Sequence, residues 1–208
     1  MIGRDRVSGL ILAGGAGRRM QTSRSPAGPR LEKPLIPLHG RPLIAWARDA
    51  LPQGLAHCYV SANTRAEAYA AYGTVVADDA SLGPGWGPLA GVASTLMRIR
   101  TPWLLVVPGD VPDPPCHLGQ GLLQYSEASG ALLAYVCSLR PQPLFMLVHV
   151  SLLANLRQYL LSGGRQAFQW VDSLGHAVRV PGDESTFFNI NTQEDICLAH
   201  QLIPPPPA

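Results

Sequence analysis

Four apolar runs of strand length alternate with helix-like segments in the first part of the chain. The apolar runs are Val7–Ala13, Ala56–Ala62, Val75–Ala77 and Trp103–Val107. Segments with the apolar spacing of helices lie at Pro42–Leu51, Arg65–Ala71, Leu89–Arg98 and His117–Tyr125. We expect Pro42 in the first turn of its helix and Thr64 as the N-cap of the next helix. Strands that alternate with helices predict an α/β fold with a doubly wound, mostly parallel sheet.

The second part of the chain predicts a pair of strands and two further helices. The strands are Ala131–Cys137 and Leu144–Val148, and the helices are Ser151–Leu161, which stops at Gly163–Gly164, and Thr192–Leu202. Thr192 is a suitable N-cap, and Asp195 at the third helical position resembles part of a capping box. The region Gly14–Arg41 is expected to be a long polar loop with a short apolar interruption at Pro34–Leu38. We expect one domain over residues 1–203, followed by a Pro-rich disordered tail at residues 204–208.

Composition and charge limit the classes of partner. A chain of 208 residues with 47% hydrophobic residues is long enough to bury one core. Its formal net charge of +2 is too small for a nucleic-acid or membrane footprint, so we expect neither partner, and any phosphate must be bound by a local site. The four cysteines show no C-x-x-C spacing, and no signal peptide is visible. Both observations favour a cytoplasmic protein.

Polar clusters follow three of the predicted strands. Gly14–Met20 comes after the first strand, Asp78 and Asp79 follow the third, and Asp110 follows the fourth. In an open parallel sheet, ligands bind at the carboxyl ends of the strands. We therefore expect these three clusters to meet at one edge of the sheet.

The loop Leu12–Met20, with the sequence L-A-G-G-A-G-R-R-M, contains residue types that hold phosphate. Glycines let backbone N–H groups approach an anion, and Arg18 and Arg19 add fixed positive charge. Lys33 is expected to reach in as a point charge. The loop is neither a Walker A motif nor a dinucleotide fingerprint, because no G-K-[ST] follows and Met20 replaces the third Gly. The alternative is a Gly-rich turn with two solvated arginines.

Carboxylates and amides near the strand ends are the other candidate ligands. A carboxylate after an apolar strand, such as Asp110, costs desolvation unless it is paired or holds a cation such as Mg²⁺. A cap or turn before Pro112 is the alternative for Asp110, and Asp79 is open between a turn residue and a ligand. Asn189 and Asn191 share a face, where they either contact a polar ligand or form an Asx turn.

The order of motifs along nearly the whole chain resembles that of the molybdenum cofactor guanylyltransferases. L-A-G-G-x-x-x-R-M and E-K-P-L-x-x-L-x-G-x-P-L are followed by V-S-A-N, G-P-L-A-G, G-D-V-P, S-G-G-R and F-F-N-I-N-T. The opening motif is shared by many nucleotidyltransferases, but its combination with G-P-L-A-G and N-x-N-T is more specific. The related cytidylyltransferases typically carry L-A-A-G, so Gly14 favours guanine.

The resemblance implies a Rossmann-like domain of the nucleotide-diphospho-sugar transferase type. It implies transfer of GMP from GTP to the terminal phosphate of molybdopterin, with release of pyrophosphate and with Mg²⁺ as cofactor. The implied nucleotide contacts are Leu12, Ala13, Gly14, Gly15, Lys33, Ser61, Asp79 and Asp110, and Asp110 also holds the metal. The implied residues of the molybdopterin side are Arg19, Gly87, Gly91, Arg165, Asn189 and Asn191. Arg19, Lys33 and Asp110 are the implied catalytic residues, and no general base is assigned because the acceptor is already a phosphate.

Two positions depart from the family pattern. Twelve residues, Gln21–Glu32, separate Met20 from Lys33, whereas the family has Lys a few residues after Met. We expect this insertion to form a mobile flap that bulges outward and lets Lys33 return to the site. Ser61 stands where the family often has Asn.

Two other functions stay open: transfer to another acceptor, such as a sugar phosphate or cobinamide phosphate, and a catalytically weak GTP-binding accessory protein. Partner proteins of molybdenum insertion and molybdoenzyme maturation are a further expectation.

Overall fold

A seven-stranded β-sheet is the central layer of the protein in the computed structural model, which describes residues 2–14, 32–83, 87–112, 115, 117–174, 178–181, 187 and 189–205. The strand order is β5-β4-β1-β6-β8-β7-β9. The strands are β1 (Val7–Leu12), β4 (His57–Ser61), β5 (Thr74–Val76), β6 (Trp103–Pro108), β7 (Leu133–Cys137), β8 (Pro141–His149) and β9 (Val178–Pro181). Strand β8 pairs antiparallel with β6 and β7, and the other pairs are parallel. The prediction of a mostly parallel sheet is confirmed.

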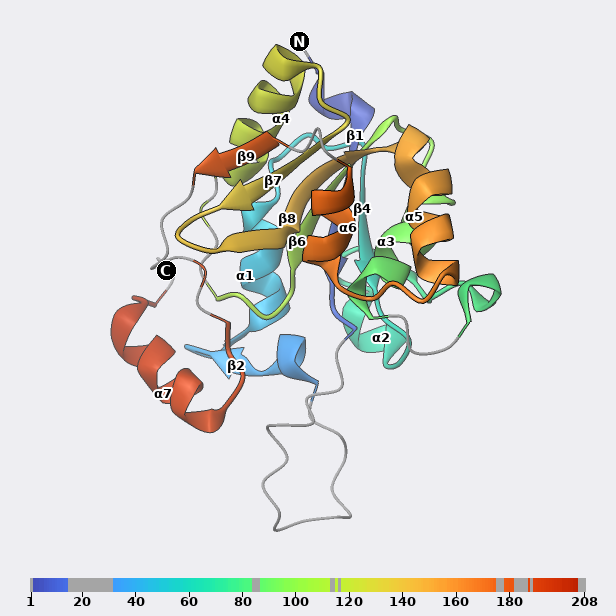
Figure 1. Cartoon of the computed structure of the whole chain (residues 1–208). Helices are drawn as coiled ribbons and strands as arrows, with labels where there is room; N and C mark the ends of the chain where they lie inside the picture. The colour runs from blue at the N-terminus through green and yellow to red at the C-terminus, as the bar shows by residue number, and fades with distance from the viewer. Residues whose placement is uncertain are drawn as a thin grey trace.

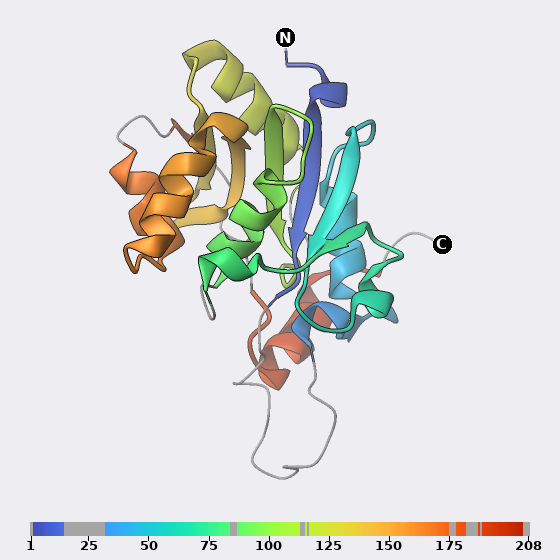
Figure 2. The same ribbon diagram turned by 90° about the vertical axis from the view of Figure 1, so that its right-hand side faces the viewer.

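Helices cover both faces of this sheet (Figures 1 and 2), so the fold has three layers. Helices α1 and α4 pack on one face, and α3, α5 and α6 pack on the other. The helices are α1 (Leu43–Ala50), α2 (Ala66–Tyr69), α3 (Pro88–Leu96), α4 (Leu118–Ser129), α5 (Leu153–Leu161), α6 (Ala167–Ser173) and α7 (Gln193–Leu202). Short 3₁₀ helices are η1 (Arg4–Arg6), η2 (Lys33–Leu35), η3 (Ala80–Leu82) and η4 (Val150–Leu152).

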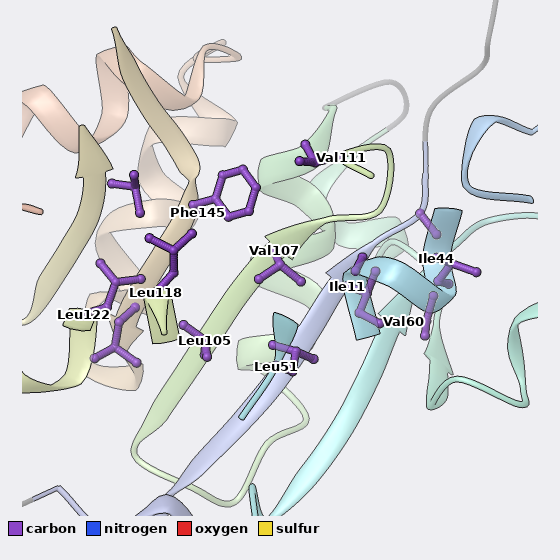
Figure 3. Packing of buried hydrophobic residues seen from close by; sticks show 14 of the residues in the cluster. Ile11, Ile44, Leu51, Val60, Leu105, Val107, Val111, Leu118, Leu122 and Phe145 are labelled. Atoms are coloured by element: carbon purple, nitrogen blue, oxygen red, sulfur yellow. The ribbon is translucent and has the colours of Figure 1, made fainter. Parts of the chain in front are cut away.

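The alternation of side chains along each strand explains the two apolar cores. Leu105 and Val107 of β6 belong to the cluster under α1 and α4, which Figure 3 shows from close by. Leu104 and Val106 of the same strand belong to the cluster under α3, α5 and α6. Because successive residues of a strand face opposite sides, a run that is apolar at every position fits a sheet buried on both faces.

A third, smaller core lies beside the carboxyl ends of the parallel strands. It joins α7 to a ribbon formed by β2 (Pro37–Leu38) and β3 (Arg41–Pro42), visible together in Figure 1. Its buried residues are Ile36, Leu38, Leu43, Ile190, Ile196 and Ala199. The capping box of α7 is confirmed, since Thr192 and Asp195 bond reciprocally. This core fixes the start of α7 near the edge of the sheet.

Three details of the sequence prediction are corrected. Thr64 is not an N-cap: α2 begins after Arg65, whose backbone is left-handed with φ of 51°, and Thr64 bonds elsewhere. Gly14–Arg41 is not a loop throughout, because its end contains η2 and β2. Helix α6 and strand β9 were not predicted at all, because both are short and owe their stability to packing and pairing on the sheet. The stop at Gly163, with φ of 99°, is confirmed.

Among the described residues, no helix combines the length and apolar character that crossing a membrane requires.

Candidate active site

The carboxyl ends of β1, β4, β5 and β6 meet at one edge of the sheet, as the sequence predicts. Backbone hydrogen bonds continue the pairing past the strands. The amide of Ala13 donates to the Ser61 carbonyl at 2.9 Å, and the amide of Ala62 donates to the Val76 carbonyl at 3.0 Å. The amide of Gly109 donates to the Leu12 carbonyl at 2.9 Å. The segments that leave these four strands therefore start side by side.

Asp110 lies in the middle of this edge, directly after β6. Gly109 before it permits a close approach, because a Cβ there would lie 3.0 Å from the Leu12 carbonyl oxygen and 3.5 Å from the Cβ of Pro34. The carbonyl of Asp110 accepts a hydrogen bond from the amide of Ile190 at 3.2 Å. Burial raises the pKa of the Asp110 carboxyl, and the positive charge of Lys33 partly offsets that rise. Asp110 is thus a partly desolvated carboxylate with a lysine as its charged neighbour.

Lys33 reaches this edge despite the insertion that precedes it. Its Nζ donates to Oδ1 of Asn191 at 2.6 Å, which joins residues 158 positions apart. The amide of Asn191 in turn donates to Oδ2 of Asp195 in the first turn of α7 at 2.7 Å. Lys33, Asp110 and Asn191 therefore form one polar cluster, which we call the Lys33 cluster.

Glu32, which directly precedes Lys33, bonds to the segment around α2. Its Oε1 accepts a hydrogen bond from the Thr64 hydroxyl at 2.5 Å, and its Oε2 accepts one from the Tyr69 hydroxyl at 2.6 Å. Sequence reasoning missed this contact. The partners of Glu32 lie 32 and 37 positions away, and no local pattern connects them.

Asp79 acts as a turn residue in this structure. Its Oδ1 accepts hydrogen bonds from the amide and hydroxyl of Ser81, at 2.9 and 2.5 Å, and it caps η3. These bonds lower the pKa of the Asp79 carboxyl. Beside it, Asn63 and Asp78 bond each other twice at 2.8 Å. The acidic pair after β5 is therefore held in place by local bonds.

Ser61 and Gly91 are buried against each other. A Cβ on Gly91 would lie 2.1 Å from the Ser61 hydroxyl oxygen and 2.8 Å from its Cβ. This glycine lets α3 lie close to the end of β4. The role that the structure gives to both residues is the packing of a helix on the sheet.

The remaining candidates are spread around the same end of the molecule. Leu12 and Ala13 are buried, whereas Gly14 is exposed. Gly87 is the N-cap of α3 and has a φ of 70°, a conformation that favours glycine. Arg165, between α5 and α6, donates to the carbonyls of Leu160 and Gly164 at 3.2 and 2.7 Å.

Asn189 is exposed, whereas Asn191 is half-buried. The side-chain amide of Asn191 donates a 3.4 Å hydrogen bond to the carbonyl of Asn189. Gly15, Arg19 and the expected flap before Glu32 lie outside the described residues. No group of three or more His, Cys, Asp or Glu side chains suited to a metal ion occurs in the part of the chain that the structure describes. Within the described residues, a cation at Asp110 would therefore need further oxygen ligands, such as those of a substrate.

The sequence and the fold have clear relatives. The model of the MobA-like NTP transferase domain family matches residues 9–177. The molybdenum cofactor guanylyltransferase of Cupriavidus taiwanensis is 38% identical over 202 residues, which cover 94% of this chain and 97% of that protein. Molybdopterin-guanine dinucleotide biosynthesis protein A from Archaeoglobus fulgidus has a TM-score of 0.73 and 23% identity, over 94% of this chain and 97% of that chain. The 2-C-methyl-D-erythritol 4-phosphate cytidylyltransferase from Thermus thermophilus has a TM-score of 0.65 and 20% identity, over 93% and 96%.

The solved structures share the nucleotide-diphospho-sugar transferase fold that the sequence predicts. With the domain match, this fold and its polar strand edge define the protein as an enzyme of the nucleotidyltransferase class. Within that class, the chain belongs to the molybdenum cofactor guanylyltransferase family.

Proposed function

We propose that this enzyme transfers GMP from GTP to the terminal phosphate of molybdopterin in the cytoplasm, with Mg²⁺ as its cofactor. An oxygen of the acceptor phosphate forms a bond to the α-phosphorus of GTP. The bond from that phosphorus to the bridging oxygen of the β-phosphate breaks, and pyrophosphate leaves. Beyond family membership, the observation that carries this proposal is the Lys33 cluster: Lys33 bonds Asn191, and the neighbouring Ile190 bonds the carbonyl of Asp110 at the carboxyl edge of the sheet.

The Asp110 carboxyl fits a magnesium ligand. It is a hard oxygen donor whose burial disfavours an uncompensated charge, as the raised pKa indicates. Mg²⁺ is commonly bound by one or two protein carboxylates together with substrate phosphates, which suits a site with one acidic side chain. When bound, the ion would neutralise charge on the phosphates of the nucleotide. Asp110 would hold it, and Lys33 beside it would contact the same phosphates.

Lys33 supplies positive charge without having to donate a proton. Asn191 binds it through a neutral amide, so the hydrogen bond orients the ammonium but leaves its charge for an anion. Charge on the leaving pyrophosphate is stabilised most by groups that are already in position before the reaction. The acceptor is itself a phosphate, so Lys33 and Asp110 position and neutralise, and no general base is required.

The two substrates would approach from different sides of this cluster. For the nucleotide, the proposal uses Leu12, Ala13, Gly14, Gly15, Lys33, Ser61, Asp79 and Asp110. For molybdopterin, it uses Arg19, Gly87, Gly91, Arg165, Asn189 and Asn191. Because Ser61 and Gly91 are buried against each other, their contribution is to place the backbone at the end of β4 and in α3. Gly14, Gly87, Arg165 and Asn189 are exposed, so all four are open to direct contact with a substrate.

A matrix of nucleotides and acceptors tests the proposal. GTP, CTP and ATP are each offered with molybdopterin, a sugar phosphate or cobinamide phosphate, and pyrophosphate release and product mass are measured. We expect product only from GTP with molybdopterin. Transfer to a sugar phosphate but not to molybdopterin would replace the proposal with its rival. GTP binding with no pyrophosphate release under any condition would indicate an accessory protein.

The Asp110→Asn variant tests the metal assignment separately. It keeps the size of the side chain and removes the negative charge, so turnover in Mg²⁺ should fall by roughly 100-fold or more. The melting temperature should not fall, because the substitution removes a buried charge and introduces none. Turnover close to that of the wild type would reject Asp110 as the metal ligand.

A further inference from the structure

Glu32 joins two segments that are separate in sequence, the end of the insertion and the segment that contains α2. We call Glu32, Thr64 and Tyr69 the Glu32 clasp. Each carboxylate oxygen of Glu32 accepts one hydroxyl hydrogen bond, from Thr64 at 2.5 Å and from Tyr69 at 2.6 Å. Hydrogen bonds to an ionised acceptor are shorter and stronger than neutral ones. The clasp is therefore a firm local attachment.

Tyr69 makes one half of the clasp rigid. Its side chain is fully buried in the core cluster that also holds α1 and α4. Burial and the neighbouring Glu32 carboxylate raise the pKa of Tyr69, so the hydroxyl stays protonated and remains a donor. Glu32 is thus tied to the packed core of the molecule.

The clasp acts directly on the backbone of Lys33. Glu32 is the N-cap of η2, and its carbonyl accepts a hydrogen bond from the amide of Leu35 at 3.0 Å. Lys33 is the first residue of η2, and the buried Pro34 lies against Gly109. The backbone of Lys33 is therefore held by the clasp, while its ammonium is held by Asn191.

This attachment compensates for a feature of the sequence. Twelve residues, Gln21–Glu32, separate Met20 from Lys33, so the covalent connection to β1 alone does little to fix the lysine. A catalytic group displaced by about 1 Å can lose two orders of magnitude in rate. Contacts beyond the covalent chain must then determine where Lys33 lies.

We propose that Glu32 is a positioning residue, whose clasp with Thr64 and Tyr69 keeps the Lys33 ammonium beside Asp110 for contact with the polyphosphate of the nucleotide. This inference rests on the proposed function, because it assumes that Lys33 binds phosphate. Both carboxylate oxygens of Glu32 already bind hydroxyl groups of the protein, and a negative charge would repel phosphate, so we assign Glu32 to positioning and not to substrate contact. Its effect on binding passes through Lys33.

The affinity for inorganic pyrophosphate, measured by calorimetry with Mg²⁺ present, tests the clasp. Glu32→Gln and Tyr69→Phe each remove one part of it and should weaken binding by about three- to ten-fold. In a Lys33→Ala background, adding Glu32→Gln should change the affinity no further. A loss of the same size in both backgrounds would show that Glu32 does not act through Lys33, and the proposal would be overturned.

Glu67→Gln is the matched control, because Glu67 is an exposed glutamate of α2 outside the clasp. It should leave pyrophosphate affinity unchanged, and circular dichroism checks that every variant is folded. Unchanged affinity in both Glu32→Gln and Tyr69→Phe overturns the proposal, as does a wild-type protein that binds no pyrophosphate. Because pyrophosphate is the leaving group of nucleotidyl transfer whatever the nucleotide and acceptor, the clasp can be tested even if the protein fails to transfer GMP to molybdopterin.

Discussion

At the scale of single residues, the chemistry depends on how the charge of Lys33 is held. A carboxylate partner would orient the ammonium and also neutralise it. Asn191 provides an oxygen acceptor with no net charge, at 2.6 Å from Nζ. Asp110, the nearby carboxylate, is itself partly buried, and this burial raises the pKa of its carboxyl. Under the proposed function, the cluster would suit a ligand that carries both anionic oxygens and a cation.

Two substitutions at Asn191 distinguish the effect of orienting the Lys33 ammonium from the effect of neutralising its charge. Asn191→Ala removes the acceptor and should lower the affinity for GTP by about ten-fold. Asn191→Asp keeps an acceptor but adds a negative charge that pairs with Lys33 and repels phosphate, so it should weaken GTP more than Asn191→Ala does. Calorimetry measures both variants, with the exposed Asn189→Asp as the control for added charge. If Asn191→Asp bound GTP as tightly as the wild type, the charge argument would be wrong.

His149 should contribute to the pH dependence of stability. Burial and the charge of Arg6 lower its pKa from the ordinary value of 6.5. Below pH 6.5 the unfolded chain therefore binds this proton more readily than the folded protein, so stability falls as the pH falls through this range. His149→Asn keeps an acceptor for the N-cap of η4 but does not titrate. Urea unfolding between pH 5 and 8 should show a shallower slope for the variant, and identical slopes would contradict the assignment.

At the scale of elements, the site depends on how closely α3 approaches the sheet. Gly91 leaves the space into which Ser61 projects. Alanine is the better helix former by about 1 kcal/mol, so helix propensity alone disfavours a glycine at position 91. The close packing of α3 on β4 is the reason, since any Cβ at position 91 would overlap Ser61.

A double-mutant cycle tests this packing. Gly91→Ala should lower the free energy of unfolding by about 1–3 kcal/mol, because it forces atoms into a filled space. In a Ser61→Gly background the same change should cost little or should stabilise, since the obstructing side chain is gone. Urea denaturation measures all four proteins. Equal costs of Gly91→Ala in both backgrounds would mean that Ser61 is not the obstacle.

The elements predicted from sequence are those whose pattern is strong in itself. Val7–Leu12 and Trp103–Pro108 are continuous apolar runs, and a sheet covered on both faces requires such runs. Helix α6 and the β2–β3 ribbon are short, and their apolar residues are buried only because distant elements cover them. A local sequence pattern does not show which distant elements will pack against a segment, so the sequence did not predict these elements.

In the candidate site too, the sequence predicts some residues and misses some contacts. Asp110 and Lys33 are recognisable in sequence because a charged residue after an apolar strand, or within a shared motif, is chemically informative. The bond from Lys33 to Asn191 spans 158 positions and depends on where the third core places α7. The contact of Glu32 with Tyr69 likewise depends on the packing of α2. Contacts of this kind follow from tertiary structure and could not be read from spacing.

At the scale of the whole molecule, one sheet edge collects the functional groups and three cores hold them there. The two large cores fix the strands, and the third core fixes α7 and the ribbon that follows Lys33. The chain is 38% identical to a molybdenum cofactor guanylyltransferase over nearly its full length. We propose that this edge transfers a guanylyl group to a phosphate acceptor.

The fate of labelled GTP tests that claim most directly. The protein is incubated with molybdopterin, Mg²⁺ and GTP labelled in either the α- or the γ-phosphate, and the products are separated and identified by mass. The account predicts that the α-label enters the molybdopterin product and the γ-label leaves as pyrophosphate, with both transfers lost in Asp110→Asn. Label released as inorganic phosphate, or α-label absent from molybdopterin under turnover conditions, would contradict it.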